Sequence, residues 1–237
     1  MVLDVMGNLS AFNAKLSHIG LLASAGRVYQ KLCDKLCGWG ELCSASGSRA
    51  RQMNVTTARA TDKKRKPGTI LVRRAPRMPA RAILQFGPLR LPAAIGRSGT
   101  TAFKREGDGA TPIASMRLLH GFVRGDRVRG VATRLPLRHI RADMLWCDEP
   151  GDPCYNRLVR APFAKSHETM SRADSLYDLC LVLDWNIVSR RSNRGSAIFF
   201  HLARSGYEPT AGCVALSPRD MRRILPHLRK GMVLRVL

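Results

Sequence analysis

From residue 68 onward, short apolar runs alternate with breaks that contain glycine and proline, a pattern typical of β-strands joined by turns. Two of these runs are separated by the Gly87-Pro88 turn signal. The runs YDLCLVLD and SAIFFH are apolar, bounded and of strand length, which favours buried strands. Strands are therefore predicted over residues 69–73, 82–86, 89–91, 116–123, 177–184, 196–201 and 232–237.

A single helix is predicted near the C-terminus. Ser217 precedes Pro218, an N-cap residue followed by a proline in the first helical turn. The helix should run to about residue 230 and stop at Gly231. Many short strands with few helices predict a mostly β, mixed domain over residues 69–237, and no internal repeat is visible.

The first 52 residues differ in pattern from the rest of the chain and are predicted to be an N-terminal extension, joined by a basic linker at residues 53–68. Three explanations of the extension stay open: a secretory signal, translation that starts at Met53, or a poorly packed or unstructured leader. The apolar run at residues 19–25 resembles a signal, but Asp4 and the single positive charge of Lys15 before it make no convincing one.

Composition and charge narrow the class of protein. The chain has 237 residues, of which 45% are hydrophobic, enough for one packed domain with an extension. No stretch reaches the roughly 18 consecutive apolar residues of a membrane span, so no transmembrane segment is predicted. The net charge of +23 requires an anionic neighbour, yet it is mostly diffuse, and 6% aromatic residues offer few stacking platforms. No specific nucleic-acid partner is predicted.

The seven cysteines form no metal-binding pattern. Cys33 and Cys37 are four residues apart, but no ligand pair follows at zinc-finger spacing, so no metal is predicted. Cys147 and Cys154 flank a turn-rich stretch and are either two free thiols or a disulfide. Cys180 lies in an apolar run and is predicted to be a small buried hydrophobe.

Cys213 has different surroundings from the other cysteines. His201 ends a predicted strand, a polar loop of eleven residues follows, and Cys213 begins the next apolar run. A cysteine nucleophile needs a base, and an imidazole can take the thiol proton and later give it to a leaving amine. Gly212 lets the chain turn tightly enough to present backbone N–H groups to a developing oxyanion. The same spacing would also occur if His201 were only a packed structural residue.

Several separated segments resemble the L,D-transpeptidase (YkuD-like) catalytic domain, a bacterial cell-wall family. They are SAIFFHLA and PTAGCVALSPRDM around His201 and Cys213, KREGDGATP at residues 104–112, and the W-C-D and Y-N segments at residues 146–148 and 155–156. The resemblance covers roughly residues 69–237 and implies a β-sandwich or mixed β fold. The Gly-Asp-Gly of the second segment is also typical of a tight turn that leads into a strand.

The resemblance implies a defined reaction on peptidoglycan stem peptides. The cysteine attacks the amide after the diaminopimelate residue, releases D-Ala, and holds the stem as a thioester until a second amine takes it. Carried over to this chain, Cys213 is the nucleophile, His201 the base, and the amides of Gly212 and Cys213 the oxyanion hole. Thr210 matches a family Ser/Thr that helps orient the imidazole or bind substrate. Nucleophile and base suffice, so no cofactor is expected.

Two departures from the family pattern affect the substrate contacts. Ala211 and Ala215 replace a histidine and an arginine that are usual there, and the loop from histidine to cysteine is shorter. Arg194 and Arg204 are near in sequence and are the candidates to bind a stem carboxylate instead, although each is also typical of a solvated surface.

The sequence thus predicts a cysteine-dependent L,D-transpeptidase that forms or remodels peptidoglycan crosslinks. One alternative is an L,D-carboxypeptidase or amidase that hydrolyses the same acyl-enzyme, and another is a non-catalytic basic binding protein. The chemistry predicts a cell-envelope or periplasmic location, and the sequence leaves the oligomeric state open.

Overall fold

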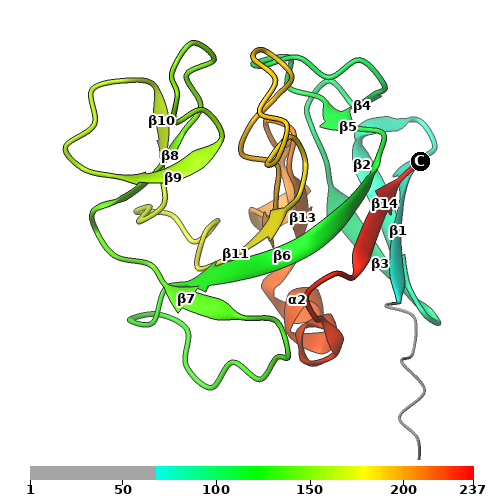
Figure 1. Cartoon of the computed structure of the whole chain (residues 1–237). Coiled ribbons are helices and arrows are strands. Elements are labelled where there is room, and N and C mark those ends of the chain that lie inside the picture. Colours follow the sequence, from blue (N-terminus) through cyan, green and yellow to red (C-terminus); the bar gives the residue numbers. More distant parts are fainter. Residues whose placement is uncertain (1–67) are drawn as a thin grey trace, which may run out of the picture. The chain divides into compact units, whose positions relative to one another are not determined.

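The computed structural model describes residues 68–237, so the predictions made for residues 1–67 lie outside the described part. Strands dominate, as predicted (Figure 1). In chain order they are β1 (Thr69–Ala75), β2 (Met78–Phe86), β3 (Leu89–Ala94), β4 (Thr100–Thr101), β5 (Thr111–Pro112), β6 (Ser115–Val123), β7 (Leu137–His139), β8 (Met144–Cys147), β9 (Arg157–Arg160), β10 (His167–Thr169), β11 (Leu179–Leu183), β12 (Phe199–Leu202), β13 (Val214–Leu216) and β14 (Val233–Val236). Helix α2 covers Pro218–Ile224, and single 3₁₀ turns cover Ser205–Tyr207 and Leu225–His227.

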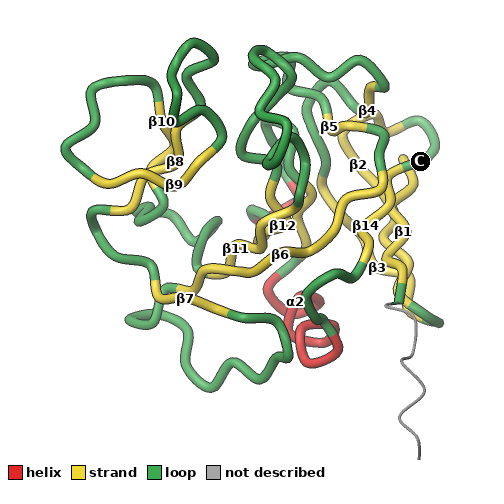
Figure 2. The backbone as a smooth tube through the Cα atoms, viewed as in Figure 1, coloured by secondary structure: helices red, strands yellow, loops and turns green. Residues whose placement is uncertain are grey.

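The largest sheet closes on itself. Its strands follow the order β11-β12-β13-β3-β2-β1-β14-β6, and β6 also pairs with β11, which closes the sheet. Strand β7 pairs with the last three residues of β6. Most neighbours are antiparallel, but β1–β14, β12–β13 and β6–β7 are parallel. Figure 2 shows long loops between the strands at the end opposite α2. A closed sheet leaves no central strand edge unpaired, so its register is held from both sides.

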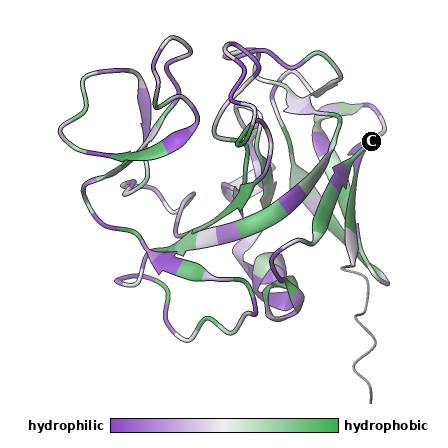
Figure 3. Cartoon of the chain, viewed as in Figure 1, coloured by the Kyte–Doolittle hydropathy of each residue, from purple (hydrophilic) through white to green (hydrophobic). Residues whose placement is uncertain are grey.

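The interior of the closed sheet is the main hydrophobic core. Alternate residues of its strands point inward, and Met221 and Ile224 of α2 pack against the same cluster. Figure 3 shows the resulting alternation of apolar and polar positions along β6. The largest members with less than 2% exposure include Ile70, Leu84, Met116, Leu118, Leu181, Phe200 and Leu216.

A second apolar layer covers the outer face of β6, β11 and β12. The separate three-stranded sheet β10-β8-β9 supplies Trp146, which packs edge-on against Phe199 with ring centroids 5.0 Å apart. Cys213 belongs to this outer layer. Because β11 and β12 are buried on both faces, they are continuous apolar runs in the sequence, and this makes them the strands that the pattern predicts most clearly.

The helix is shorter in the structure than the sequence pattern predicts. Its start is confirmed, because the Ser217 hydroxyl accepts a hydrogen bond from the Asp220 N–H at 3.1 Å. Its predicted end at residue 230 is wrong: regular helix stops at Ile224 and a 3₁₀ turn follows. Pro226 lacks the amide hydrogen that an α-helix needs at that position, which ends the helix early.

We predict that Phe200→Ala destabilises the domain by about 3–5 kcal/mol, because it removes a ring that is 0% exposed from the centre of the core. Denaturant unfolding of the full chain measures the free energy of unfolding. The matched control is Val188→Ala, at a side chain 89% exposed, which should change it by less than about 0.5 kcal/mol. Equal effects of the two substitutions would contradict this description of the core.

Candidate active site

The parallel pair β12–β13 brings His201 and Cys213 to one face of the sheet. His201 lies opposite Ala215 in the register, and Cys213 is two residues before Ala215 on the same strand path. Residues two apart along a strand point to the same side. Both side chains line one cavity of about 560 Å³ on the outer face of the closed sheet. The structure therefore brings together the two residues that the sequence paired.

The Cys213 thiol is held by backbone groups. The Phe199 N–H donates to Cys213 Sγ at 3.3 Å, and the thiol donates to the Ala197 carbonyl at 3.2 Å. The residue is 8% exposed, and burial raises the pKa of the thiol to about 12, an effect that the Phe199 amide only partly opposes. At neutral pH the group is therefore a thiol and not a thiolate.

The imidazole of His201 has a defined tautomer. Its Nδ1 lies 2.7 Å from the Leu202 carbonyl, and because a carbonyl only accepts, Nδ1 carries the hydrogen. This leaves Nε2 as the basic nitrogen. Burial lowers the pKa of His201 to about 4, so the ring is neutral at pH 7, and the Tyr177 ring packs against it edge-on at 5.4 Å.

Two nearby charges act on the thiol in opposite directions. The Lys104 ammonium, 3% exposed and paired with Asp108, lines the cavity and lowers the pKa of Cys213. The Glu168 carboxylate lines it as well and raises that pKa. Neither charge offsets burial, so the resting cavity holds a neutral thiol and a neutral imidazole.

The turn before Cys213 requires glycine. Gly212 has a φ of +143°, and a Cβ there would lie 3.0 Å from the Ala110 carbonyl oxygen. The Thr210 hydroxyl donates to the Cys213 carbonyl at 2.7 Å and accepts from the Gly212 N–H at 3.2 Å. The Gly212 amide, expected in the oxyanion hole, is thus already paired in this structure.

Thr210 is expected from the resemblance to help orient the imidazole or bind substrate. Its hydroxyl makes its hydrogen bonds within the nucleophile turn, and the Leu202 carbonyl orients the imidazole instead. Thr210 still lines the cavity, so a substrate contact stays a prediction.

The KREGDGATP segment forms part of the cavity wall. The turn predicted there is present, with Gly107 at φ +70° and Gly109 at φ +66°. The sequence left open whether this segment also shapes the cleft, and the structure shows that it does: Lys104, Glu106 and Gly107 line the cavity. Thr111 Oγ1 lies 3.5 Å from the Cys213 carbonyl oxygen and donates to it, a contact across 102 residues that no local pattern in the sequence indicates.

Asn156, from the Y-N segment, ties the outer sheet to the loop that holds the thiol. Its Oδ1 accepts from Trp146 Nε1 and from the Ala197 N–H, both at 3.0 Å, and its Nδ2 donates to the Trp185 carbonyl at 3.1 Å. Ala197 also supplies the carbonyl that accepts from Cys213. One buried amide therefore positions three segments around the Cys213 thiol.

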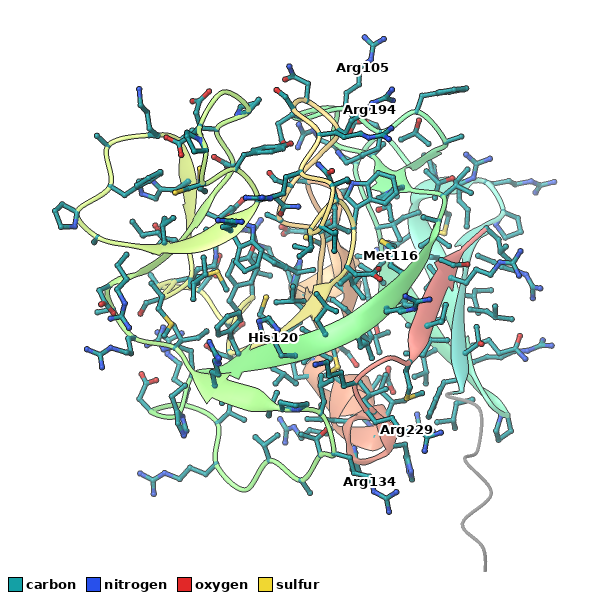
Figure 4. All side chains as sticks on the ribbon, viewed as in Figure 1. Arg105, Met116, His120, Arg134, Arg194 and Arg229 are labelled. Carbon is teal, nitrogen blue, oxygen red and sulfur yellow. The ribbon has the colours of Figure 1, made fainter. Side chains whose placement is uncertain are left out.

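The two predicted arginines lie in different places. Arg204 lines the cavity with Cys213 and pairs loosely with Asp174 at 3.3 Å and Glu208 at 3.5 Å. Arg194 lines a separate hollow beside Trp185 instead, in the loop region at the upper end of Figure 4. The sequence did not single out Arg97 and Arg172, which the structure places in the cavity wall.

The other three cysteines in residues 68–237 form no disulfide bond. Cys147, Cys154 and Cys180 are free thiols, and Cys180 is buried as predicted. In this part of the chain, no group of three or more His, Cys, Asp or Glu residues could hold a metal ion. None of its helices is long and apolar enough to span a bilayer.

Comparison with known proteins identifies the family. The model of the YkuD family, the L,D-transpeptidase catalytic domain, matches residues 46–236. The chain belongs to this family. The match begins inside the segment predicted as an extension, and the boundary at residue 52 stays a prediction. No curated protein matches the chain.

Two solved structures are similar to this chain at low identity. One is an L,D-transpeptidase from Mycobacterium smegmatis, with 12% identity, a TM-score of 0.35, and coverage of 72% of this chain and 58% of that one. The other is L,D-transpeptidase 1 from Mycobacterium tuberculosis, with 13% identity, a TM-score of 0.31, and coverage of 71% and 62%. The aligned part of this chain spans about three fifths of those proteins.

We predict that alkylation of Cys213 by iodoacetamide becomes about tenfold faster per pH unit from pH 7 to pH 10, without a plateau, because the thiolate is the reactive form and the pKa is about 12. Peptide-resolved mass spectrometry of the full chain separates Cys213 from the other thiols, and Cys213→Ala verifies the assignment. A rate that levels off below pH 8 would show a preformed thiolate and contradict the neutral site.

Proposed function

We propose that the protein is a cysteine-dependent L,D-transpeptidase that acts on peptidoglycan stem peptides through a thioester on Cys213. The observation that carries the proposal is the placement of a thiol and an unprotonated imidazole nitrogen on one face of two parallel strands, in one cavity. This is the pairing of nucleophile and base that thiol acyl transfer needs.

The first half of the reaction follows from the protonation states. As Cys213 Sγ attacks the carbonyl carbon of the donor amide, the thiol proton passes to Nε2 of His201. A carbon–sulfur bond forms, the carbon–nitrogen bond breaks, and the imidazolium gives its proton to the leaving amine. The Nδ1–H bond to the Leu202 carbonyl holds the ring in the required tautomer throughout.

Positive groups in the cavity wall suit an anionic donor. Lys104, Arg97, Arg172 and Arg204 line the cavity, and stem peptides carry free carboxylates. Arg204 is the best placed of the predicted arginines to hold such a carboxylate, because its present ion pairs are long. The positive charge of the chain suits an anionic cell wall, and the reaction belongs in the cell envelope.

The first test is formation of the acyl-enzyme. The full chain incubated with a tetrapeptide stem should gain the mass of the stem minus the terminal D-Ala, on the peptide that contains Cys213. Cys213→Ala should abolish the adduct, and His201→Ala should slow its formation by about 10²–10⁴-fold, because the base is lost. His227→Ala, at an exposed histidine outside the cavity, is the matched control and should react normally.

The products then separate the open alternatives. Crosslinked dimers are expected from transpeptidation, whereas tripeptide stems alone would assign an L,D-carboxypeptidase or amidase. If neither the wild-type chain nor Cys213→Ala forms an adduct, the remaining alternative is a non-catalytic binding protein.

Gly212→Ala should slow acyl-enzyme formation by about tenfold or more, because a Cβ at φ +143° strains the nucleophile turn against the Ala110 carbonyl. Gly151→Ala is the control, since a Cβ there meets nothing within 4 Å. The adduct is measured by intact mass over time. Unchanged kinetics in Gly212→Ala would show that the exact form of this turn does not matter.

A further inference from the structure

The cavity that contains Cys213 has more negative charge than the composition suggests. The chain has 17 acidic residues against 40 basic ones, yet four carboxylates line this one cavity. Glu106 accepts from the Tyr155 hydroxyl, and Glu208 and Glu168 each have one arginine at 3.5 Å, Arg204 and Arg172 respectively. Asp148 differs, because one of its carboxylate oxygens has no hydrogen-bond partner.

Asp148 and Glu168 are diagonal neighbours across β8 and β10, two positions apart in the register. Glu168 is in β10, opposite Trp146 of β8, and Asp148 directly follows β8, with its N–H donating to the Ser166 carbonyl at 3.2 Å. Burial raises the pKa of Glu168, and the negative charge of Asp148 raises it further. Two carboxylates that repel each other at the wall of a cavity are stabilised by a cation between them.

The positively charged side chain nearest to Glu168 does not fully neutralise its carboxylate. Arg172 is 3.5 Å from the Glu168 carboxylate, but it makes its closer bonds, 2.8 and 2.9 Å, to Asp174. The Tyr177 hydroxyl reaches Glu168 only at 3.4 Å, and Asp174 raises the Glu168 pKa further.

Two buried polar atoms in the same wall point to a missing ligand. Asp148 Oδ1 is inaccessible and has no hydrogen-bond partner. The Ser196 hydroxyl, on a residue 6% exposed, lies near the Tyr155 hydroxyl but completes no hydrogen bond of good geometry. Buried polar atoms of this kind cost free energy unless a partner arrives. Both residues line the cavity that a ligand with several N–H donors would enter.

We propose that Asp148 and Glu168 bind the primary ammonium group of the acceptor and that Glu168 takes its proton before acyl transfer. This rests on the proposed thioester on Cys213. The ammonium loses one proton to the Glu168 carboxylate, and the free amine attacks the thioester carbonyl carbon. A carbon–nitrogen bond forms, the carbon–sulfur bond breaks, and the second amine proton passes through His201 to the departing thiolate, which restores the thiol. Glu168 then releases its proton to solvent.

The subsite explains how a neutral site can select an amine over water. An ammonium is the abundant form of a primary amine at neutral pH but is no nucleophile, so the enzyme gains by binding it and removing one proton. Water has no positive charge, so the carboxylate pair attracts it less strongly than it attracts an ammonium. The subsite therefore favours crosslinking over hydrolysis.

The test compares two nucleophiles on one acyl-enzyme. The full chain is acylated with a tetrapeptide stem, then offered either a stem peptide with a primary amine or hydroxylamine, which is uncharged near neutral pH. Glu168→Gln should lower the ratio of amine transfer to hydrolysis by about tenfold or more, and Asp148→Asn should lower it in the same direction. Both variants should still form the acyl-enzyme, and their ratio of hydroxylamine capture to hydrolysis should stay within about twofold of wild type, because this ratio does not depend on how fast Cys213 is acylated.

Glu149→Gln is the matched control, because it removes the same charge from the residue next to Asp148 but outside the cavity. It should leave the ratio unchanged. An unchanged ratio in Glu168→Gln would overturn the proposal, as would an equal loss with hydroxylamine. Slower acylation with a normal ratio would place the carboxylates on the donor side and also overturn it.

A second measurement needs no acyl transfer, so it distinguishes failure of the subsite from failure of the proposed function. Glu168 raises the pKa of Cys213, so a bound ammonium should favour the thiolate. A tripeptide stem, which carries the amine but lacks the amide that Cys213 attacks, should therefore speed alkylation of Cys213 by about twofold or more in wild type, but not in the Asp148→Asn/Glu168→Gln double variant. Equal rates with and without the peptide in wild type would contradict the subsite, whatever the outcome of the acylation test.

Discussion

The parallel pairing of β12 with β13 is the constraint on which the site depends. It fixes His201 opposite Ala215 and leaves Cys213, directly before β13, on the same face, so the strand pairing largely sets the relation between the imidazole and the thiol. Both strands belong to a closed sheet, with β11 on one side and β3 on the other, so a shift of register would disturb the whole ring.

Burial of this pair has a chemical consequence. The apolar layer formed by the outer sheet raises the pKa of Cys213 and lowers that of His201, so the neutral forms of both are favoured. Under the proposed mechanism, the thiol stays protonated until a substrate carbonyl is positioned for its attack. Backbone groups of Phe199, Ala197 and Leu202 hold the two side chains in place, so little reorganisation is needed when the proton moves.

Much of the fold could be predicted from the sequence, because β11 and β12 are continuous apolar runs and β2 and β3 flank a glycine–proline turn. Short strands such as β7 and β10, each three residues long, have no periodicity to detect, and Pro226 ends the helix before the glycine that the pattern favours. His201 and Cys213 could be found because they are close in the sequence. Asp148, Glu168 and Lys104 reach the cavity only through long-range pairing, which no local pattern records.

The central claim is that the resting site holds a neutral imidazole, with its hydrogen on Nδ1, beside a neutral thiol. Nitrogen NMR of the six histidines in the full chain, with His201 assigned through a His201→Gln variant, measures this directly. We expect His201 to show the neutral Nδ1–H tautomer from pH 5.5 to pH 9, and to charge only as the pH approaches about 4. An imidazolium at pH 7 that becomes neutral in Cys213→Ala would reveal a thiolate–imidazolium ion pair and contradict the account.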